Sequence, residues 1–355
     1  MQILSDFNKD TQTQSKESGS YEWWYFDFLG QGGYSVVIIF YDGNPFSRRY
    51  ISELNSGKQA NPGNYPALSL SVYKEGTPLF YLFDECDPSE TDFSEDQPKG
   101  FVKKNSFSGY KTDVGLKYDI TLNQKLPSGD KIEASLSFIS ESWDASELVK
   151  ESGGKEDHIW NLVGPRCDVS GEINISGYQE HQIEVAGTGY HDHNAGFEPM
   201  KESFTEWYWG RYHLSNSTLV YYLMNEQGTW KYKAWLICGK GGEIRQLKTE
   251  MNKNNLQRNL FGLKSCRAFT FYDDHTELYL QKDRVTDDGP FYQRFEGRLI
   301  AKKGEKIEEC RGISEYIYPS RIYNKLFWPL VNMRIAYPGK AHWVQKNPIL
   351  YRWTW

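Results

Sequence analysis

The densest group of ionisable side chains lies in the sequence GTGYHDHNAGF, which covers residues 187–197. In an extended strand, alternation places Tyr190, Asp192 and Asn194 on one face. His191 and His193 then point to the opposite face. Five consecutive polar or titratable side chains make a poor core strand. Three explanations are open: a metal site at the two histidines, a structural role in which the imidazoles bond to backbone groups, and a catalytic or ligand-facing surface.

A metal site at the two histidines needs a third and a fourth ligand, and none follows at a recognisable spacing. The carboxylate between His191 and His193 also points away from them on a strand. We therefore predict no metal. The face that carries Tyr190 and Asp192 is the favoured catalytic or ligand-facing surface.

Upstream, the sequence DHIWNLVGPR places His158 and Trp160 two positions apart, hence on one face of any strand. His158 is either a satisfied core histidine or a partner that meets Asp192 across the mouth of a barrel. A carboxyl group enclosed by aromatic rings loses its water, which favours the protonated form and lets it act as a donor. A neighbouring imidazole could hold or resupply that proton.

Two aromatic segments resemble each other: EWWYFDF begins at position 22 and EWYWGRY at position 206. Alternation places rings on both faces of each strand, so that one face can line a cavity while the other fills a core. Aromatic faces stabilise both apolar ligands and cationic carbon centres. The candidate substrate-binding residues are Trp160, Glu22, Trp23, Trp24, His191, Asn194, Glu206, Trp207 and Trp209.

Composition limits the function. The chain has 355 residues and a net charge of -6. This length favours two domains, and the negative charge argues against nucleic acid as a partner. The five cysteines show no C-x-x-C spacing, which argues against disulfides and favours the cytoplasm. No apolar run is long enough for a signal peptide or a membrane span, and no nucleotide-binding or hydrolase motif is present.

The pattern of strands predicts a mainly β chain. Aromatic residues make up 16% of the sequence and lie in short runs between Gly, Asn, Asp and Pro. Three features recur in the same order in each half: the aromatic strand, a second hairpin (LSLSVYKEGTPLFYLF and YKAWLICGKGGEIRQL), and the segment GEINIS before GTGYHD, which is echoed by GRLIAK before GISEYI. We predict two tandem barrels related by internal duplication, with few short helices. Residues 1–19 form a flexible polar leader, 20–197 the first domain and 198–355 the second.

Five motifs together resemble the carotenoid 1,2-hydratase (hydroxyneurosporene synthase) family: EWWYFDF, the H-x-W pair, the GxGYHDHNxG block, EWYWGRY and GISEYIYP. The resemblance spans roughly residues 20–330, and the fungal decalin-forming Diels–Alderases and related terpene cyclases look like distant relatives. It implies a tandem lipocalin-like fold, a ligand cavity and no cofactor. In that family a proton is added to a terminal isoprenoid double bond, and water captures the tertiary cation.

Carried over to this chain, the resemblance implies a site made of His158, Trp160, Tyr190 and Asp192, with Asp192 as the proton donor. One position departs from the family. The family usually has Trp after the Asn of the GxGYHDHN block, where this chain has Ala195. We expect this change to enlarge the pocket or to remove a wall that faces the cation, so that a polyene other than a linear carotenoid becomes a candidate substrate.

The leading hypothesis is an enzyme, a hydratase-like lyase or a cyclase, that protonates an alkene in a hydrophobic isoprenoid or polyene. The alternative is a pericyclase that holds a linear polyene folded and lowers the barrier by orientation. A third hypothesis is a non-catalytic carrier of lipid or pigment. An apolar substrate of this kind also allows peripheral contact with a membrane during uptake.

Overall fold

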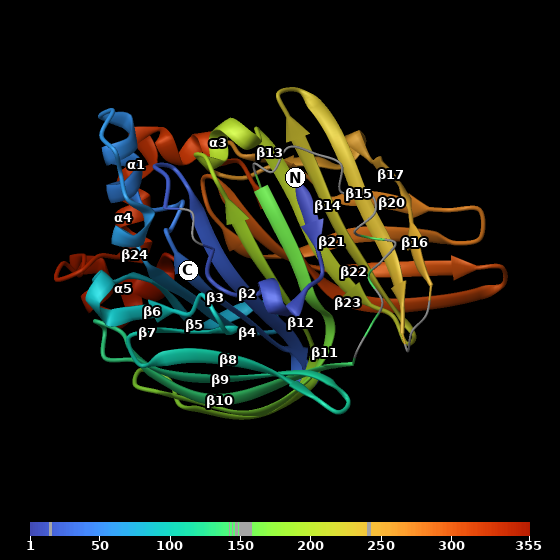
Figure 1. Ribbon diagram of the computed structural model, residues 1–355, viewed down its shortest axis with the longest axis horizontal. Coiled ribbons are helices and arrows are strands. Elements are labelled where there is room, and N and C mark those ends of the chain that lie inside the picture. The colour runs from blue at the N-terminus through green and yellow to red at the C-terminus, as the bar shows by residue number, and fades with distance from the viewer. Residues whose placement is uncertain (14–15, 142, 144, 146–147, 149–157, 240–242) are drawn as a thin grey trace. The chain divides into compact units, whose positions relative to one another are not determined.

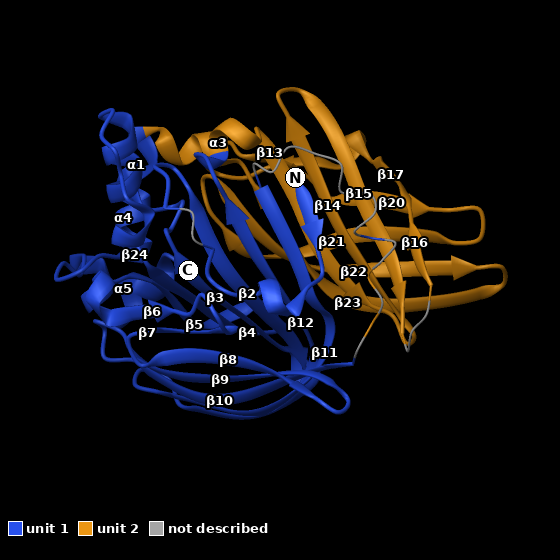
Figure 2. Cartoon of the chain, viewed as in Figure 1, with its two compact units in different colours: residues 1–142, 146–200, 325–355 blue, residues 143–145, 201–324 orange. Residues whose placement is uncertain are grey.

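The computed structural model describes residues 1–13, 16–141, 143, 145, 148, 158–239 and 243–355. The chain divides into two compact units (Figure 2). Unit 1 contains residues 1–142, 146–200 and 325–355, and unit 2 contains residues 143–145 and 201–324. Both are built mainly from antiparallel strands, with few short helices, as predicted from the sequence (Figure 1).

Unit 1 is a half-barrel made from one strongly curved sheet, with the strand order β24-β5-β4-β3-β2-β12-β11-β10-β9-β8-β7-β6. A short strand, β1, pairs with β11 in parallel at one side of this path. The strands are β1 (Gln2–Leu4), β2 (Tyr21–Gly30), β3 (Tyr34–Asp42), β4 (Ala67–Lys74), β5 (Thr77–Glu85), β6 (Thr91–Phe93), β7 (Lys99–Val102), β8 (Asn105–Thr112), β9 (Gly115–Lys125), β10 (Lys131–Glu141), β11 (His158–Ser176), β12 (His181–Gly196) and β24 (Ile335–Ala336).

Unit 2 is a nearly closed barrel with the strand order β16-β15-β14-β13-β23-β22-β21-β20-β17. Its sheet bends until β17 lies beside β15. A separate hairpin, β18 and β19, accompanies it. The strands are β13 (Glu206–His213), β14 (Ser217–Glu226), β15 (Thr229–Cys238), β16 (Ile244–Gln246), β17 (Lys248–Met251), β18 (Leu256–Arg258), β19 (Lys264–Cys266), β20 (Ala268–Tyr272), β21 (Glu277–Asp288), β22 (Tyr292–Lys303) and β23 (Lys306–Ile317).

The described helices are short. No helix in the described part of the chain has both the length and the apolar character needed to cross a bilayer. The α-helices are α1 (Arg48–Asn55), α3 (Met200–Ser203), α4 (Trp328–Arg334) and α5 (Pro348–Trp353). The 3-10 helices are η1 (Phe7–Lys9), η2 (Gln31–Gly33), η3 (Pro62–Asn64), η4 (Pro88–Glu90), η5 (Lys253–Asn255), η6 (Pro319–Tyr323), η7 (Lys325–Phe327) and η8 (Trp343–Lys346).

Tight turns connect the hairpins where the sequence offers residues that tolerate a positive φ. Glu75 and Gly76 join β4 to β5 with φ values of 51° and 73°. Gln227 and Gly228 join β14 to β15 with φ values of 50° and 91°. Two consecutive left-handed residues match the twist of antiparallel strands, and glycine adopts this conformation without steric cost.

Aromatic rings fill the interior of each unit. In unit 1, Phe26 lies 5.6 Å from both Phe107 and Phe138, measured between ring centroids. In unit 2, Tyr208 stacks on Tyr316 at 4.5 Å. All five rings are buried. Burial of such large apolar surfaces is the main favourable contribution to the stability of each sheet.

The two sheets repeat one topology. From β5 to β8, unit 1 reads β5-β4-β3-β2-β12-β11-β10-β9-β8, and unit 2 reads β16-β15-β14-β13-β23-β22-β21-β20-β17. The aromatic strands β2 and β13 occupy the same place, and so do β12 and β23, which contain GTGYHD and GISEYI. The predicted duplication of lipocalin-like β-units is therefore confirmed by strand order.

The ends of the chain differ from the predicted division. Residues 1–19 were expected to form a flexible leader, yet Gln2–Leu4 pairs with β11 and Asp10 is fully buried. The second domain was expected to extend to residue 355, yet residues 325–355 belong to unit 1, where β24 adds to the edge of β5. The polar composition of residues 1–19 suggested a solvated leader. The buried contacts of this segment are made with strands far away in the sequence, so composition could not show them.

Candidate active site

The predicted chemistry-bearing segment is β12, which lies between β2 and β11 in the sheet of unit 1. Asp192 is opposite Tyr25 of β2, and Asn194 is opposite both Trp23 of β2 and Trp160 of β11. Alternation therefore directs these side chains to one side of the sheet. We call this side the acid face and the opposite, barrel-interior side the core face.

Asp192 is enclosed on the acid face, with only 3% of its surface exposed. Its Oδ2 accepts hydrogen bonds from the indole Nε1 of Trp160 at 2.7 Å and from the hydroxyl of Tyr190 at 2.6 Å. Its Oδ1 accepts a hydrogen bond from Nδ2 of Asn194 at 2.9 Å. Three neutral donors thus converge on one buried carboxyl group. Such donors stabilise its ionised form without adding a positive charge.

His158 is linked to Asp192 indirectly. Its Nε2 lies 3.2 Å from Oδ1 of Asn194, and its Nδ1 lies 3.2 Å from the hydroxyl of Tyr21. Burial lowers the pKa of His158 from 6.5 to about 3, so the ring is neutral near pH 7. The sequence left two possibilities open for His158: a satisfied core histidine, or a partner that meets Asp192 across the mouth of a barrel. In the structure β11 lies beside β12, and the amide of Asn194 connects the imidazole to the carboxyl group.

Aromatic rings surround this chain of hydrogen bonds on the acid face. Trp23 stacks on Tyr21 at 5.4 Å between ring centroids and lies 6.0 Å from the ring of His158. Tyr25 meets Tyr190 edge-on at 6.2 Å. The acid face therefore combines one carboxyl group, one neutral imidazole and several rings, a composition that suits an apolar substrate and a cationic intermediate.

The core face carries a second polar cluster directly behind Asp192. Oδ2 of Asp10 accepts from the hydroxyl of Tyr118 at 2.5 Å and lies 3.0 Å from Nε2 of His191. His193 lies between two carboxylates: its Nε2 is 2.7 Å from Oε1 of Glu22, and its Nδ1 is 3.5 Å from Oδ1 of Asp10. Both imidazoles therefore have structural partners on the face opposite the acid.

Electrostatics in this core cluster depends on burial and pairing. Burial raises the pKa of Glu22, although the hydrogen bond from His193 opposes the shift. Burial acts in the opposite direction on His193, but the bond to Glu22 and the charges of Glu22 and Asp10 together raise its pKa above 6.5. Trp24 stacks on the imidazole of His193 at 4.6 Å. The cluster holds the N-terminal segment against the half-barrel.

The predicted site residues thus fall into three groups. The acid face brings together His158, Trp160, Tyr190, Asp192, Asn194 and Trp23. The core face holds Glu22, Trp24 and His191. The remaining three, Glu206, Trp207 and Trp209, lie on β13 of unit 2. Oε2 of Glu206 accepts a hydrogen bond from the hydroxyl of Tyr316 at 2.5 Å. Trp207 stacks on Tyr222 with 6.3 Å between ring centroids, and Trp209 is buried.

Sequence reasoning missed Tyr21, Asp10 and Tyr118. Tyr21 had a usable signal, because it precedes Trp23 by two positions and so shares its face. Asp10 had none: it lies in a polar segment, 181 residues before its partner His191. Tyr118 of β9 had none either, because it lies 108 residues after its partner Asp10. Long-range pairing of this kind leaves no local pattern.

Ala195 lies on the face of β12 opposite the acid. It pairs with Glu22 of β2 and Ile159 of β11, and alternation puts its side chain on the core face. A larger residue at this position would point away from Asp192. The effect of Ala195 on a ligand pocket therefore stays a prediction, and it does not act through direct contact with Asp192.

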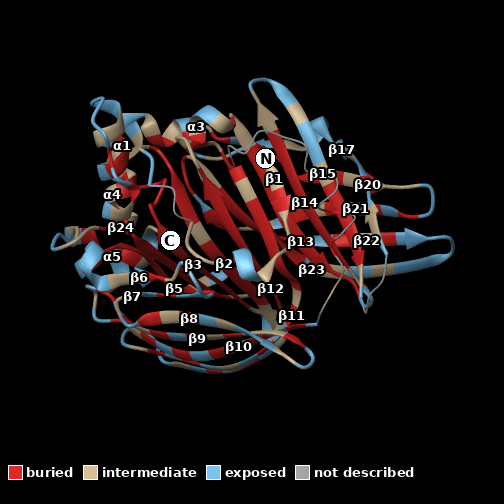
Figure 3. Ribbon diagram, in the orientation of Figure 1, coloured by how far each residue is buried: buried red, intermediate tan, exposed pale blue. Residues whose placement is uncertain are grey.

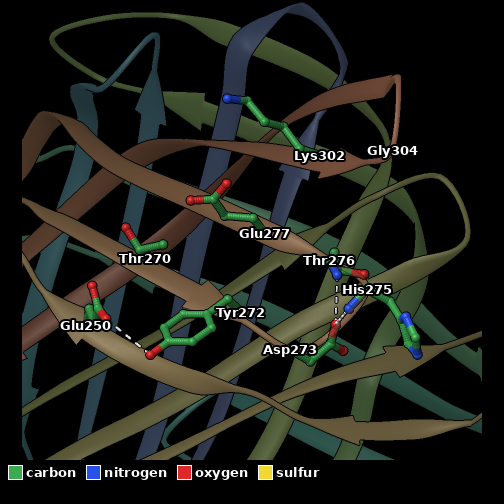
Figure 4. Close-up of a pocket in the computed structure, with 9 residues that line it drawn as sticks. All are labelled: Glu250, Thr270, Tyr272, Asp273, His275, Thr276, Glu277, Lys302 and Gly304. Carbon is green, nitrogen blue, oxygen red and sulfur yellow. Dashed lines mark hydrogen bonds between the residues drawn. The ribbon is translucent and has the colours of Figure 1, made fainter.

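A pocket of about 590 Å³ lies on unit 2, and its lining contains none of these residues (Figure 4). Its lining includes the carboxyl groups of Glu250, Asp273 and Glu277. Glu250 accepts a hydrogen bond from the hydroxyl of Tyr272 at 3.1 Å. An open pocket with this charged lining does not suit an apolar polyene.

Comparisons with known proteins agree with this fold. The chain is 29% identical to hydroxyneurosporene dehydrogenase of Chlorobaculum tepidum, over 96% of this chain and 93% of the relative. It is 23% identical to the acyclic carotenoid 1,2-hydratase of Thiocapsa roseopersicina, over 85% and 70%. The fold is similar to the crystal structure of CghA with Sch210972, with a TM-score of 0.59 at 10% identity, covering 89% of this chain and 96% of that one.

The family model described as carotenoid hydratase CrtC matches residues 38–346. This range contains the whole of β11 and β12, and therefore the acid with its three donors. The protein described here belongs to the carotenoid hydratase CrtC family.

Proposed function

We propose that this protein protonates a carbon–carbon double bond of an apolar isoprenoid or polyene with Asp192, giving hydration or ring closure. The observation that carries the proposal is the buried carboxyl group held by Trp160, Tyr190 and Asn194. Membership of a hydratase family supports a reaction at a double bond. The similarity to an acyclic carotenoid 1,2-hydratase supports a substrate of the carotenoid class.

The proposed reaction is balanced without an oxidant or a reductant. The π electrons of the alkene take the proton of the Asp192 carboxyl group, which leaves a carbocation and a carboxylate. Water adds to the cation through its oxygen, and the resulting oxonium returns a proton to the carboxylate. Hydration therefore consumes one alkene and one water and regenerates the acid, so the proposal includes no cofactor. In a cyclisation, an internal double bond captures the cation instead, and the new cation then loses a proton from a neighbouring carbon to the Asp192 carboxylate, which regenerates the acid.

The three hydrogen-bond donors act most strongly after the proton has left. Trp160, Tyr190 and Asn194 all donate to the carboxylate oxygens, so they stabilise the conjugate base that forms in the transition state. Because the donors are already in place and buried, little reorganisation is needed at that moment. This preorganisation lowers the barrier to protonating a weakly basic alkene.

The same surroundings accommodate the protonated acid. The indole of Trp160 can only donate, but the hydroxyl of Tyr190 and the amide of Asn194 can each turn to accept. With the amide turned, Nδ2 of Asn194 donates to Nε2 of His158, and Nδ1–H of His158 donates to the hydroxyl of Tyr21. The same chain of hydrogen bonds therefore accommodates both the protonated and the ionised form of Asp192, and His158 is neutral in both cases.

The neutral state of His158 also suits a cationic intermediate. A protonated imidazole near the acid face would repel a carbocation, whereas burial keeps the pKa of this group at about 3. The rings of Trp23 and Tyr25 add negative π faces to the same surface. The acid face is thus suited to generate a cation and to leave it without a nearby positive charge.

The reaction in deuterated water tests this proposal. The protein is incubated with acyclic carotenoid and other isoprenoid polyenes, and the products are analysed by mass spectrometry. We expect solvent deuterium on carbon, with a mass increase from added water in the hydration case.

Two outcomes would contradict the proposal. A cyclised product without deuterium on carbon would indicate a pericyclic reaction. Tight binding of the polyenes with complete recovery of unchanged material would indicate a carrier.

A further inference from the structure

The last part of unit 1, residues 325–355, differs in charge from the rest of the chain. It contains five Lys or Arg residues and no Asp or Glu. Since the whole chain carries a net charge of -6, the remainder carries -6 minus 5, or -11. Four of the 12 tryptophans also lie in this part. Basic residues mixed with tryptophan are typical of surfaces that meet a lipid headgroup layer.

Three exposed apolar residues of this part lie on one side of α5. Ile349, Leu350 and Trp353 lie within about 100° of arc at 100° per residue, and all three are exposed. Trp353 is 83% exposed and Ile349 is 60% exposed. Trp343, in the preceding 3-10 helix, is 64% exposed. Figure 3 shows the exposed residues along α5. We call these four residues the apolar patch.

The helix that presents the apolar patch is anchored on its other side. Tyr351 is buried, and its hydroxyl donates to the carbonyl of Arg334 at 3.2 Å. Arg352 forms an ion pair with Asp130 at 2.9 Å and donates to the carbonyl of Leu79 at 3.0 Å. The helix that carries the apolar patch is therefore held in place, and its apolar side chains stay exposed to water. This exposure is unfavourable, and a partner that covers the patch would relieve it.

Two lysines lie close to the apolar patch in the sequence: Lys340 precedes Trp343 by three positions, and Lys346 precedes Ile349 by three. Lys340 and Lys346 are exposed, and no ion pair to either is described within the part of the chain that the structure covers. Lys346 ends the 3-10 helix that contains Trp343, and one residue, Asn347, separates it from α5. Unpaired ammonium groups beside exposed tryptophan and isoleucine favour a partner that is both anionic and apolar.

We propose that the apolar patch with Lys340 and Lys346 is a docking surface for an anionic lipid bilayer. The rings of Trp343 and Trp353 lie at the headgroup level, Ile349 and Leu350 reach the acyl region, and the lysines bind lipid phosphates. A polyene substrate dissolves in the same bilayer, so the inference extends the proposed function to substrate supply. Docking itself needs no substrate and no chemistry.

Co-sedimentation of the full chain with vesicles tests the docking surface. Vesicles are made of phosphatidylcholine alone or with phosphatidylglycerol. We expect binding to the anionic vesicles, weakened by salt. The double variant Ile349→Ser/Trp353→Ser should lose most of this binding. The matched control is Leu260→Ser/Ile307→Ser on unit 2, where the original residues are 98% and 68% exposed, and it should bind as the unmodified protein does.

The electrostatic part has its own pair of variants. Lys340→Gln/Lys346→Gln should lower affinity for anionic vesicles on the order of tenfold, because each lysine near a charged membrane contributes favourably. Lys58→Gln/Lys104→Gln removes the same charge from two exposed lysines elsewhere and should have little effect.

The proposal is overturned if the unmodified protein does not bind anionic vesicles. It is likewise overturned if both control variants lose as much affinity for these vesicles as the patch variants. It is also overturned if light scattering shows a dimer that Ile349→Ser/Trp353→Ser dissociates, since a second copy then covers the patch. Turnover of substrate in detergent micelles separates this result from the proposed function, because the patch variants should keep that turnover.

Discussion

At the scale of residues, the reactivity of Asp192 depends on which donors are fixed and which can turn. Trp160 is the fixed one, because an indole can donate but not accept. Tyr190 and Asn194 can exchange the two roles. This difference gives the three neighbours separate contributions that single substitutions can distinguish.

Trp160→Phe keeps an aromatic ring but removes the fixed donor to Oδ2 of Asp192. We expect kcat to fall roughly 100-fold, as for loss of one preorganised donor to a developing charge. The measurement is kcat together with near-ultraviolet circular dichroism, which should still show packed aromatic residues. Trp230→Phe in unit 2 is the control and should keep kcat. Equal kcat values for Trp160→Phe and the unmodified protein would remove Trp160 from the mechanism.

His158 links the site to stability at acidic pH. Its pKa is lowered in the folded state, so below pH 6.5 the unfolded chain binds a proton that the folded chain excludes. Stability should fall by at most about 1.4 kcal/mol per pH unit from this group. In His158→Gln, the loss of unfolding free energy between pH 7 and pH 5 should therefore be smaller, as measured by urea titration. The control is His275→Gln, at an exposed histidine, which should lose as much unfolding free energy between pH 7 and pH 5 as the unmodified protein. An equal loss in His158→Gln would show that His158 does not cause this pH dependence.

At the scale of elements, β12 serves two purposes because its side chains alternate. The acid face presents Asp192, while on the core face His191 pairs with Asp10 of the N-terminal segment and His193 pairs with Glu22 of β2. The alternation was predictable from the sequence, because it needs only an extended strand. The partners of the core face were not, because pairing across the sheet depends on contacts far apart in the chain.

Asp10→Asn tests the role of the N-terminal segment. The change removes a charge from a fully buried cluster, and we expect a loss of roughly 3 kcal/mol in unfolding free energy. The raised pKa of His193 contributes stability that is present below 6.5 and lost as the pH rises through its folded value. Weakening this pair should therefore cost more at pH 6 than at pH 9, by urea titration at both. The control is Asp96→Asn, at an exposed site. If Asp10→Asn lost as little unfolding free energy as this control, Asp10 would not hold the N-terminal segment in place.

At the scale of the whole molecule, duplication was followed by divergence. Glu315 of β23 is opposite Trp209 of β13, as Asp192 is opposite Tyr25 of β2. Glu315, however, accepts from the guanidinium of Arg294 at 3.0 Å. An ion pair thus occupies in unit 2 the position that the acid occupies in unit 1. The sequence echoes predicted the shared topology, but they gave no information about which copy kept the acid and its donors.

The interior of unit 2 contains a group that opposes its stability. Lys282 is 2% exposed, its Nζ lacks a hydrogen-bond partner among the described residues, and it lies 4.3 Å from the ring of Tyr208. Burial lowers its pKa well below 10.5, so near pH 7 the unfolded chain binds a proton that the barrel disfavours. Lys282→Met should therefore raise unfolding free energy at pH 7 by about 1–4 kcal/mol, with a smaller gain as the pH approaches 10.5.

Urea titration of Lys282→Met at pH 7 and pH 10 measures this effect, with Lys104→Met as an exposed control. A destabilised variant at pH 7 would show that the ammonium and the surrounding rings interact favourably in the barrel.

The most direct test of the central claim is the turnover of Asp192→Asn with an isoprenoid polyene. The amide keeps the size of the side chain but has no acidic proton to give. We expect turnover to be lost, with kcat at least 1000-fold lower, while the affinity for the polyene and the folded signal are retained. A variant that binds and turns over the polyene like the unmodified protein would contradict the account.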